Sequence, residues 1–390
     1  MLAVLDCLII GGGIHGTALS YVLSKRLPPE RLRVLDPYEE PLARWDAMTE
    51  NVGMTFLRSP HVHHLHPDPF ALATFARTRD GQPDAHFIPV FSRPSLALFH
   101  NFSKQLITRH RLRDLRVTGR ARGLTRLENG WRVETEHGAL DARRVILAIG
   151  ATEQPLWPDW AETLRAAGAP INHIFDPDFR RSQLPAWSKL VLIGGGLSAA
   201  QTALALAAQQ PGSVTLLMRH PLRIFSFDSD PCWVVPICLK DFHTEADFDR
   251  RRAIIRQARH SGSVPAEIAE EIRAAAARGH LDIQIGEAQS AEQQPQGYLC
   301  LRTATGTLKA DRILLATGFD PARPGGAWLD QAITDYDLPV AACGYPVIAP
   351  ALRWSDGLYV SGPLAELEIG PAARNIIGAR LAGERLRAIF

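Results

Sequence analysis

The sequence predicts an α/β protein in which a second parallel-sheet domain is inserted into a first. The first observation is the stretch "CLIIGGGIHGTALSYVLS", in which a short apolar run, three glycines and a helical pattern follow one another. The second is "KLVLIGGGLSAAQTALALA", from Lys189 to Ala207, which repeats that order. Short apolar runs that lead into glycine turns and helices are typical of strands buried on both faces of a parallel sheet. Two such units predict two dinucleotide-binding (Rossmann-like) domains.

Length and composition describe a globular chain and exclude several classes of function. The 390 residues suffice for two or three domains, and 46% hydrophobic with 22% charged residues is far from a disordered composition. A formal net charge of +2 gives no argument for nucleic-acid binding. No run approaches the ~18 apolar residues that cross a membrane, and the apolar N-terminus lacks the basic start of a secretion signal. We therefore expect a cytoplasmic protein with neither nucleic-acid nor membrane partners.

The first glycine loop has the pattern G-x-G-x-x-G at Gly11, Gly13 and Gly16. The first glycine permits a tight turn, the second lets a pyrophosphate approach the backbone, and the third lets the helix pack on the strand. Asp36 ends the next apolar run, "RLRVLD", at the position where an acid binds a ribose hydroxyl. A glycine turn with a purely structural role is the alternative.

The second loop carries Gly194, Gly196 and Ala199, with Ser198 at the start of its helix. The position of the acid is taken by Arg219, whose guanidinium suits a 2′-phosphate and so predicts NADPH rather than NADH. An ordinary surface arginine at a strand end is the alternative. A fixed flavin and a diffusible nicotinamide explain two sites in one chain, so we assign the first site to FAD.

The order of the segments sets the expected domain limits. These limits are 1–150 and 317–390 for the FAD-binding domain, 151–187 for a proline-rich linker, and 188–316 for the NADPH-binding domain. The pattern also predicts a helix at 93–110, antiparallel strands that feed a last buried strand before residue 150, and a charged helical region at 244–279.

The cysteines and histidines show no pattern of a redox relay. The five cysteines are odd in number and scattered, which indicates a reducing compartment. Cys232 and Cys238 lack the C-x-x-C spacing of a redox pair, so we expect them to pack as apolar side chains. The cluster "HVHHLH" at 61–66 lies in a proline-rich loop, and we interpret it as the polar wall of a site. A metal site there is the weaker alternative, and we expect no bound metal.

Three segments carry a resemblance to a known family. "DRILLATGF" at 311–319 resembles the D-x-x-x-(L/F)-A-T-G-(Y/F) signature of class B flavin-dependent monooxygenases. "GMTFLRSP" is similar to the Ser-Phe-Leu-Lys-Asp segment of the lysine and ornithine N-hydroxylases of siderophore biosynthesis, and "RPSLALFHNF" to their Arg-x-x-Phe-x-x-Tyr helix. These segments keep the family's order over most of the chain. The resemblance implies that Thr317 and Gly318 belong to the NADPH site.

The resemblance implies an FAD- and NADPH-dependent monooxygenase that N-hydroxylates a primary amine of an amino acid or a related metabolite. NADPH would reduce FAD, O2 would add to give a C4a-hydroperoxyflavin, and the distal oxygen would pass to the small-molecule amine substrate. This chemistry needs positioning and a dry pocket rather than a reactive side chain, so no catalytic residue is assigned. The related N-hydroxylases also suggest a homo-oligomer.

Four side chains are candidates for substrate binding: Arg58, His64, Asp230 and Trp233. The family's lysine falls on Arg58, which suits bidentate binding of a carboxylate, with a surface role as the alternative. The family's Ser-Pro-Phe-x-Asn-Glu segment is replaced by "FDSDPCWVVPICLKDF". There Asp228, Asp230 and Trp233 shape a different pocket, or serve as cap, turn or core residues. The family's glutamine falls on Gly53, which removes a contact to the flavin.

The C-terminal region adds two glycines to the expected FAD site. Gly362 follows the strand pattern "GLYVS", and a helix is predicted after Gly370 and Pro371. In flavoproteins with two nucleotides, such a helix directs its positive end at the flavin ring, and a helix that only packs is the alternative. Two other functions stay open: an NAD(P)H-dependent flavin reductase or dehydrogenase without oxygen insertion, and a nucleotide-binding redox sensor.

Overall fold

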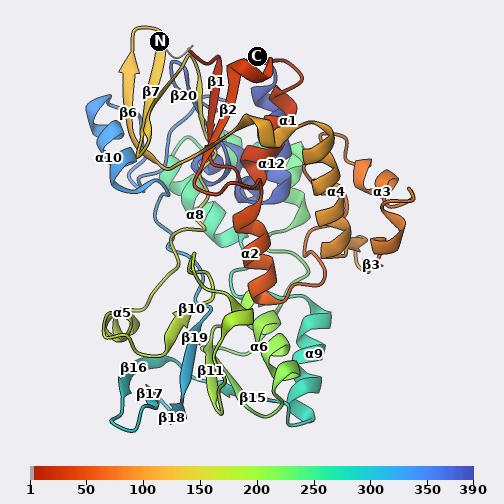
Figure 1. Ribbon diagram of the computed structural model, residues 1–390, viewed down its shortest axis with the longest axis vertical. Helices are drawn as coiled ribbons and strands as arrows, with labels where there is room; N and C mark the ends of the chain where they lie inside the picture. Colours follow the sequence, from red (N-terminus) through yellow and green to blue (C-terminus); the bar gives the residue numbers. More distant parts are fainter. Residues whose placement is uncertain (1–3) are drawn as a thin grey trace.

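The computed structural model describes residues 4–390 and has two α/β bodies, one above the other in Figure 1. The upper sheet has the strand order β20-β21-β9-β1-β2-β5, in which β20 runs antiparallel to β21 and the other pairs are parallel. The lower sheet has the order β10-β19-β11-β12-β15, with parallel pairs throughout. Two three-stranded antiparallel sheets, β6-β7-β8 and β16-β17-β18, flank them.

The strands have the following bounds: β1 Cys7–Ile10, β2 Leu32–Asp36, β3 Phe87–Ile88, β4 Arg93–Pro94, β5 Arg116–Thr118, β6 Ala121–Leu127, β7 Gly130–Thr135, β8 Gly138–Ala142, β9 Val145–Leu147, β10 Ile171–His173, β11 Leu190–Ile193, β12 Val214–Met218, β13 Arg223–Ile224, β14 Ser263–Val264, β15 Leu281–Ile285, β16 Ala288–Gln293, β17 Leu299–Thr303, β18 Gly306–Ala310, β19 Arg312–Leu315, β20 Arg353–Ser355 and β21 Leu358–Val360.

The helices have the following bounds: α1 Ile14–Leu23, α2 Ala43–Val52, α3 Ala71–Phe75, α4 Leu96–Arg109, α5 Asp159–Ala166, α6 Leu197–Gln209, α7 Pro236–Thr244, α8 Phe248–Ala258, α9 Ala266–Ala277, α10 Gly326–Asp335, α11 Glu366–Ile369 and α12 Ile376–Leu386. None of the helices in the described part of the chain has the length and apolar character to cross a membrane.

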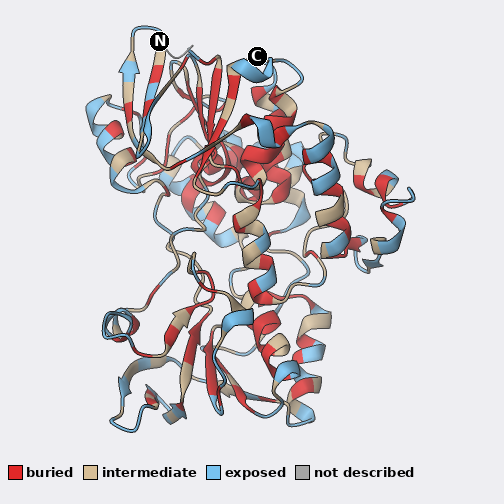
Figure 2. Ribbon diagram, viewed as in Figure 1, coloured by how far each residue is buried: buried red, intermediate tan, exposed pale blue. Residues whose placement is uncertain are grey.

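The centre of each body is a sheet of short apolar strands. All four residues of β1 and all four of β11 are buried, as expected of central parallel strands covered on both faces (Figure 2). Strand β21 returns to the upper sheet beside β9 after the lower sheet is complete. The second Rossmann-like domain is therefore inserted into the first, which confirms the predicted fold class. Helix α4 and the antiparallel strands β6 to β8 also lie where the pattern predicted them.

The predicted linker at 151–187 is more than a linker. It contains helix α5 and strand β10, and β10 pairs in parallel with β19 at the edge of the lower sheet. The prolines that suggested a linker lie outside these two elements. Because β10 has only three residues, its alternation is too short to be recognised as a strand in the sequence.

A second departure concerns the segment of helices α7 and α8, which was assigned to the lower domain. Leu239, Phe242 and Ile255 pack with Tyr345 and Leu367, which lie in the C-terminal part of the chain. Figure 1 accordingly shows α8 in the upper body. The charged region predicted at 244–279 is two separate helices, α8 above and α9 below, and α9 packs on α6. Apolar residues on α7 and α8 pack on the upper body, which the sequence order alone does not reveal.

The bodies are joined by the segments near 155 and 319, by the passage of the chain through α7 and α8, and by helix α2. The segments around 155 and 319 run antiparallel to each other: Leu156 N–H donates to Gly318 O at 2.9 Å, and Asp320 N–H donates to Gln154 O at 2.8 Å. Helix α2 reaches from the upper body onto α6 (Figure 1). At its end, the Asn51 side chain donates to Phe179 O at 2.9 Å and accepts from the backbone N–H of Arg181 at 3.1 Å.

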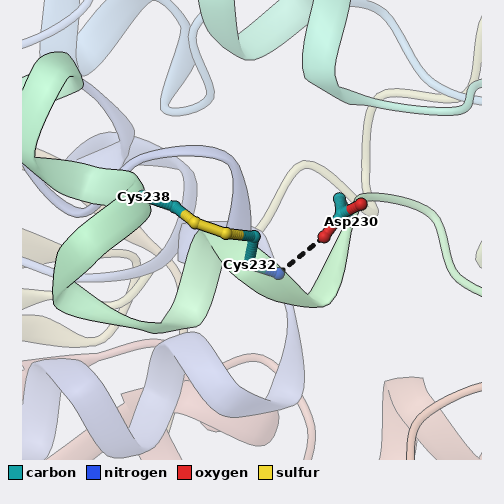
Figure 3. The surroundings of a disulfide bond; sticks show 3 residues. All are labelled: Asp230, Cys232 and Cys238. Atoms are coloured by element: carbon teal, nitrogen blue, oxygen red, sulfur yellow. Dashed lines mark hydrogen bonds between the residues drawn. A yellow bond between two sulfur atoms is a disulfide. The ribbon is translucent and has the colours of Figure 1, made fainter.

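The structure joins Cys232 and Cys238 in a disulfide, which corrects the expectation that both pack as free thiols (Figure 3). Their Cα atoms lie 5.6 Å apart, within the usual range for a disulfide. The 3-10 turn Pro231–Val234 brings the start of α7 back toward Cys232, whose N–H donates to the capping Asp230 side chain. This pair also weakens the argument from the cysteines for a reducing compartment.

Reduction of this disulfide is expected to lower the free energy of unfolding by about 2 kcal/mol, because the bond closes a short loop in the unfolded chain. The measurement is thermal unfolding of the wild-type protein with and without dithiothreitol. The matched control is the double variant Cys232→Ser/Cys238→Ser. Its melting temperature should equal that of the reduced wild type and should not change when dithiothreitol is added. An identical melting temperature for oxidised and reduced wild type contradicts the prediction.

Candidate functional site

The first glycine loop forms a cradle between β1 and α1. Gly11 has φ +106°, and a Cβ there would lie 2.5 Å from Ala148 O. A Cβ at Gly16 would overlap the carbonyl of Gly11, so the third glycine lets α1 pack tightly on the turn. By contrast, a Cβ at Gly13 would meet nothing within 4 Å among the described residues, apart from the adjoining backbone. The space over Gly13, beside the free N–H groups that begin α1, fits a pyrophosphate.

Asp36 ends β2 beside this cradle, as the sequence predicted. Its Oδ2 accepts the backbone N–H of Gly12 at 2.5 Å, and its Oδ1 accepts the backbone N–H of Tyr38 at 3.0 Å. Arg116 donates to the same Oδ1 at 2.9 Å. A carboxylate offers about four acceptor positions, so one position stays available for a ribose hydroxyl.

The second loop repeats this geometry between β11 and α6. Gly194 has φ +154°, and a Cβ there would lie 2.5 Å from Ala316 O and 3.1 Å from the Cβ of Ala199. Gly196 faces the backbone of Gly262, which would lie 3.4 Å from an added Cβ. Ser198 is in the first turn of α6, where N–H groups are free for an anion.

Arg219 follows β12 with its side chain 75% exposed, and its nearest acidic partner is Glu287 at 3.8 Å. An ion pair this exposed contributes little. The guanidinium is therefore accessible to an anion at the position where the sequence placed a 2′-phosphate.

Thr317 and Gly318 lie where the two bodies connect. The Thr317 hydroxyl donates to Leu156 O at 2.5 Å and accepts from His173 Nε2 at 3.1 Å. His173 is fully buried, and its Nδ1 accepts the backbone N–H of Phe175 at 3.1 Å. Burial lowers the pKa of His173 to about 3, so the ring is neutral. The hydroxyl of Thr317 thus holds the connection together, and its contact with a nicotinamide stays a prediction.

His15, in the middle of the first glycine motif, is a residue that the sequence analysis missed. The Ser361 hydroxyl donates to His15 Nδ1 at 2.8 Å, and His15 Nε2 donates to Asn375 O at 3.2 Å. The ring lies against Gly362, which has φ +69°. Burial lowers the pKa of His15 to about 4. A neutral imidazole therefore joins the first cradle to the C-terminal loop that contains Gly362.

Gly370 has φ +91° and packs on α7, where a Cβ would meet Leu239 at 3.0 Å. The helix expected after Pro371 begins as a 3-10 turn, Pro371–Arg374, and continues as α12 from Ile376. The C-terminal segment thus makes its turns where the two glycines allow them. Contact of Gly362 or Gly370 with a flavin stays a prediction.

Arg58 holds the backbone of the segment that replaces the family's substrate motif. Its Nη2 donates to Phe225 O at 2.8 Å and to Phe227 O at 2.7 Å, and its Nε donates to Ser226 O at 3.1 Å. Burial lowers the pKa of Arg58 to about 10, so the side chain remains charged near neutral pH. Nη1 makes no hydrogen bond to residues 4–390 and stays available to a substrate carboxylate.

Among residues 4–390, Arg58 makes no hydrogen bond to the other three substrate candidates. His64 is 1% exposed, donates from Nε2 to Pro69 O at 3.2 Å and accepts the backbone N–H of His66 at Nδ1. Asp230 caps the turn at Cys232, and Trp233 packs edge-to-face on Phe242. For Asp230 and Trp233 these contacts are the capping and packing roles that were the alternatives, and contact of any of the three with a substrate stays a prediction.

Asp228 is the charged residue of this segment that lies near Arg58. It accepts from Arg259 Nη2 at 2.9 Å and from the Asn375 amide at 3.2 Å, while Arg259 donates to Pro371 O at 3.0 Å. Asp228 raises and Arg259 lowers the pKa of Arg58, after the larger effect of burial, so these groups share one environment. Arg259 and Asn375 carry no sequence signal, because they meet Asp228 only through the folding of distant segments.

Comparisons with known proteins agree with this architecture. A family model described as FAD-NAD(P)-binding matches residues 8–152. No curated protein sequence is detectably similar to the chain. Among solved structures, the ornithine N-hydroxylase of Kutzneria sp. 744 has a TM-score of 0.76 at 14% identity, covering 99% of this chain and 98% of that one.

Two further structures share the fold. The L-lysine 6-monooxygenase of Pseudomonas syringae has a TM-score of 0.69 at 17% identity, covering 99% and 98% of the two chains. The cadaverine monooxygenase of Erwinia amylovora, solved with FAD, has a TM-score of 0.71 at 14% identity, covering 98% and 94%. At these identities the likeness shows a common two-domain fold.

Proposed function

We propose that this protein is an FAD- and NADPH-dependent monooxygenase that N-hydroxylates a primary amine of an amino acid or a related metabolite. The observation that carries the proposal is the pair of dinucleotide cradles, one with an acid at the strand end and the other with an accessible guanidinium. The first cradle fits FAD, because Gly11 and Gly16 are closely packed while the space over Gly13 is open. When bound, FAD supplies the hydride acceptor and the oxygen-activating ring, and NADPH supplies the hydride.

The residues of the chain have distinct tasks in this proposal. The start of α1 holds the pyrophosphate of FAD, Asp36 its ribose, and the start of α6 the pyrophosphate of NADPH. His15 fixes the C-terminal loop against the first cradle through Ser361. Arg58, through Nη1, suits a carboxylate at the far end of an amino-acid substrate. The amine must reach the flavin uncharged, and we assign no side chain to that deprotonation. The proposed site of action is cytoplasmic.

The amine-hydroxylating activity is supported by the fold shared with ornithine, lysine and cadaverine oxygenases. The test is to incubate the FAD-loaded protein with NADPH, O2 and each of these three amines, measuring NADPH loss, hydrogen peroxide, and hydroxylamine by mass. Hydroxylamine formed in proportion to NADPH supports the proposal. NADPH oxidation that gives peroxide with every amine favours a flavin reductase or dehydrogenase. No NADPH oxidation at all favours a redox sensor.

Replacement of Arg219 by alanine is expected to weaken NADPH binding about 10- to 100-fold, because charge-assisted hydrogen bonds to the 2′-phosphate are lost. NADH, which lacks that phosphate, should bind as before. The measurement is titration of each nucleotide by its nicotinamide fluorescence. Glu287→Gln is the matched control: it removes the competing carboxylate and should leave NADPH binding equal or stronger. Equal losses for NADPH and NADH in Arg219→Ala would refute the assignment.

A further inference from the structure

Arg116 lies against the first cradle, although no motif in the sequence pointed to it. It is the first residue of β5, which pairs in parallel with β2. Its side chain, 7% exposed, crosses the end of β2 and donates from Nη2 to Asp36 Oδ1 at 2.9 Å and to the carbonyl of Tyr38. A guanidinium buried to this degree carries a large desolvation cost unless its partners offset it.

The same guanidinium also packs against the glycine motif. A Cβ at Gly12, the residue between the first two motif glycines, would overlap Arg116 Nη1. Gly12 itself donates its N–H to Asp36 Oδ2 at 2.5 Å. Arg116, Gly12 and Asp36 therefore form one closed arrangement, in which the carboxylate is held from both sides. The buried Nε of Arg116 has no hydrogen-bond partner among residues 4–390, so the protein satisfies this guanidinium only through Nη2.

This arrangement has a direct consequence for the binding of a nucleotide. An acid at the end of β2 recognises ribose hydroxyls, but its negative charge repels the pyrophosphate that the start of α1 attracts. A guanidinium 2.9 Å from that acid offsets the repulsion, and one acceptor position of the carboxylate still stays available for a ribose hydroxyl. It also fixes the orientation of the carboxylate before the nucleotide arrives, which lowers the entropy lost on binding.

We propose that Arg116 is a positioning residue for the adenosine half of the dinucleotide in the first site, acting through Asp36 and Gly12. The inference rests on the proposed function only in that this dinucleotide is FAD. The exposed neighbour Arg113 pairs with Glu40 at 2.6 Å and takes no part in the arrangement, which makes it a matched control for the loss of one positive charge.

The test is FAD affinity, measured by flavin fluorescence on protein freed of its flavin, for the wild type and for Arg116→Met, Arg116→Lys and Arg113→Met. Arg116→Met should weaken FAD binding at least tenfold. Arg116→Lys should recover part of the loss because the charge returns, and Arg113→Met should match the wild type. NADPH affinity at the second site should be unchanged in all three variants. Thermal unfolding identifies any variant that fails to fold.

A double-mutant cycle with Asp36→Asn separates positioning from a general structural role. If Arg116 acts through Asp36, the double variant Arg116→Met/Asp36→Asn should bind FAD about as weakly as the weaker single variant. If the double variant loses FAD binding free energy equal to the sum of the two single losses, the inference is overturned. It is also overturned if a folded Arg116→Met variant binds FAD within twofold of the wild-type affinity. Absence of FAD binding by the wild type itself overturns the proposed function as well as this inference, so the two failures are distinguishable.

Discussion

Acidification from about pH 6.5 to about pH 4 is expected to remove most of the stability of this protein. Three buried histidines, His15, His64 and His173, each use one ring nitrogen as donor and the other as acceptor. Burial lowers the pKa of His15 and His64 to about 4 and that of His173 to about 3. In the unfolded chain the same rings titrate near 6.5.

The direction in which pH changes the free energy of unfolding depends on whether the folded or the unfolded state binds more protons. Between pH 6.5 and 4 the unfolded chain takes up protons at these three histidines while the folded chain does not, so the free energy of unfolding falls as the pH falls. Above pH 6.5 all three rings are neutral in both states, and the contribution is complete. Each ring accounts for on the order of 3 kcal/mol across this window. Together these losses approach the whole stability of an ordinary protein.

The measurement is urea unfolding at a series of pH values from about 7 to about 4. His64→Gln should reduce the pH dependence by about one proton over this window, because that ring no longer titrates in the unfolded state. His137→Gln, at an exposed position, is the control and should keep the wild-type slope. A free energy of unfolding that stays constant over this range in the wild type contradicts the prediction.

The glycine cradles could be predicted because their signal is local. Gly11, Gly13 and Gly16 lie within six consecutive residues, and their spacing alone predicts that the first and third pack closely while the second leaves open space. The same holds for Asp36, which ends β2, and for Arg219, which directly follows β12, because both lie at a fixed distance from their loops. Local patterns of this kind also placed α4 and the antiparallel strands β6 to β8.

The rest of the site depends on contacts between distant segments, which a single sequence does not show. Arg116 meets Asp36 from 80 residues away, and His15 meets Ser361 from 346 residues away. The sequence also does not show that His64 is buried, with both ring nitrogens satisfied by its neighbours Pro69 and His66. The disulfide was missed because the turn at Asp230 brings Cys238 back to Cys232, and spacing alone gave no sign of it.

Glu366 is where the inserted helices meet the C-terminal segment. Its side chain, 1% exposed, forms ion pairs with Arg252 of α8 and with Arg374, the latter at 2.6 Å. Arg374 also donates to the Tyr345 hydroxyl at 2.6 Å, and the Arg252 guanidinium lies 4.0 Å from the centre of the Tyr345 ring. One carboxylate therefore compensates two arginines and ties α8 to the residues that precede Gly370.

Replacement of Glu366 by glutamine is expected to lower the free energy of unfolding by about 3–5 kcal/mol, because it leaves buried positive charge without compensation. The control is Glu384→Gln: Glu384 is 54% exposed and lies 3.9 Å from Arg380, so this variant should lose less than about 0.5 kcal/mol. Urea unfolding at neutral pH measures both. A Glu366→Gln variant within about 1 kcal/mol of the wild type would show that the arginines find other partners.

The charge itself, rather than the volume of the side chain, should be the cause of this loss. The double variant Arg252→Leu/Glu366→Leu removes one positive and one negative charge together and keeps apolar volume at the junction. It should be more stable than Glu366→Gln, because only Arg374, 22% exposed, then lacks its partner. If the double variant is instead the less stable of the two, the ion pair between α8 and the C-terminal segment provides stability that apolar packing cannot replace.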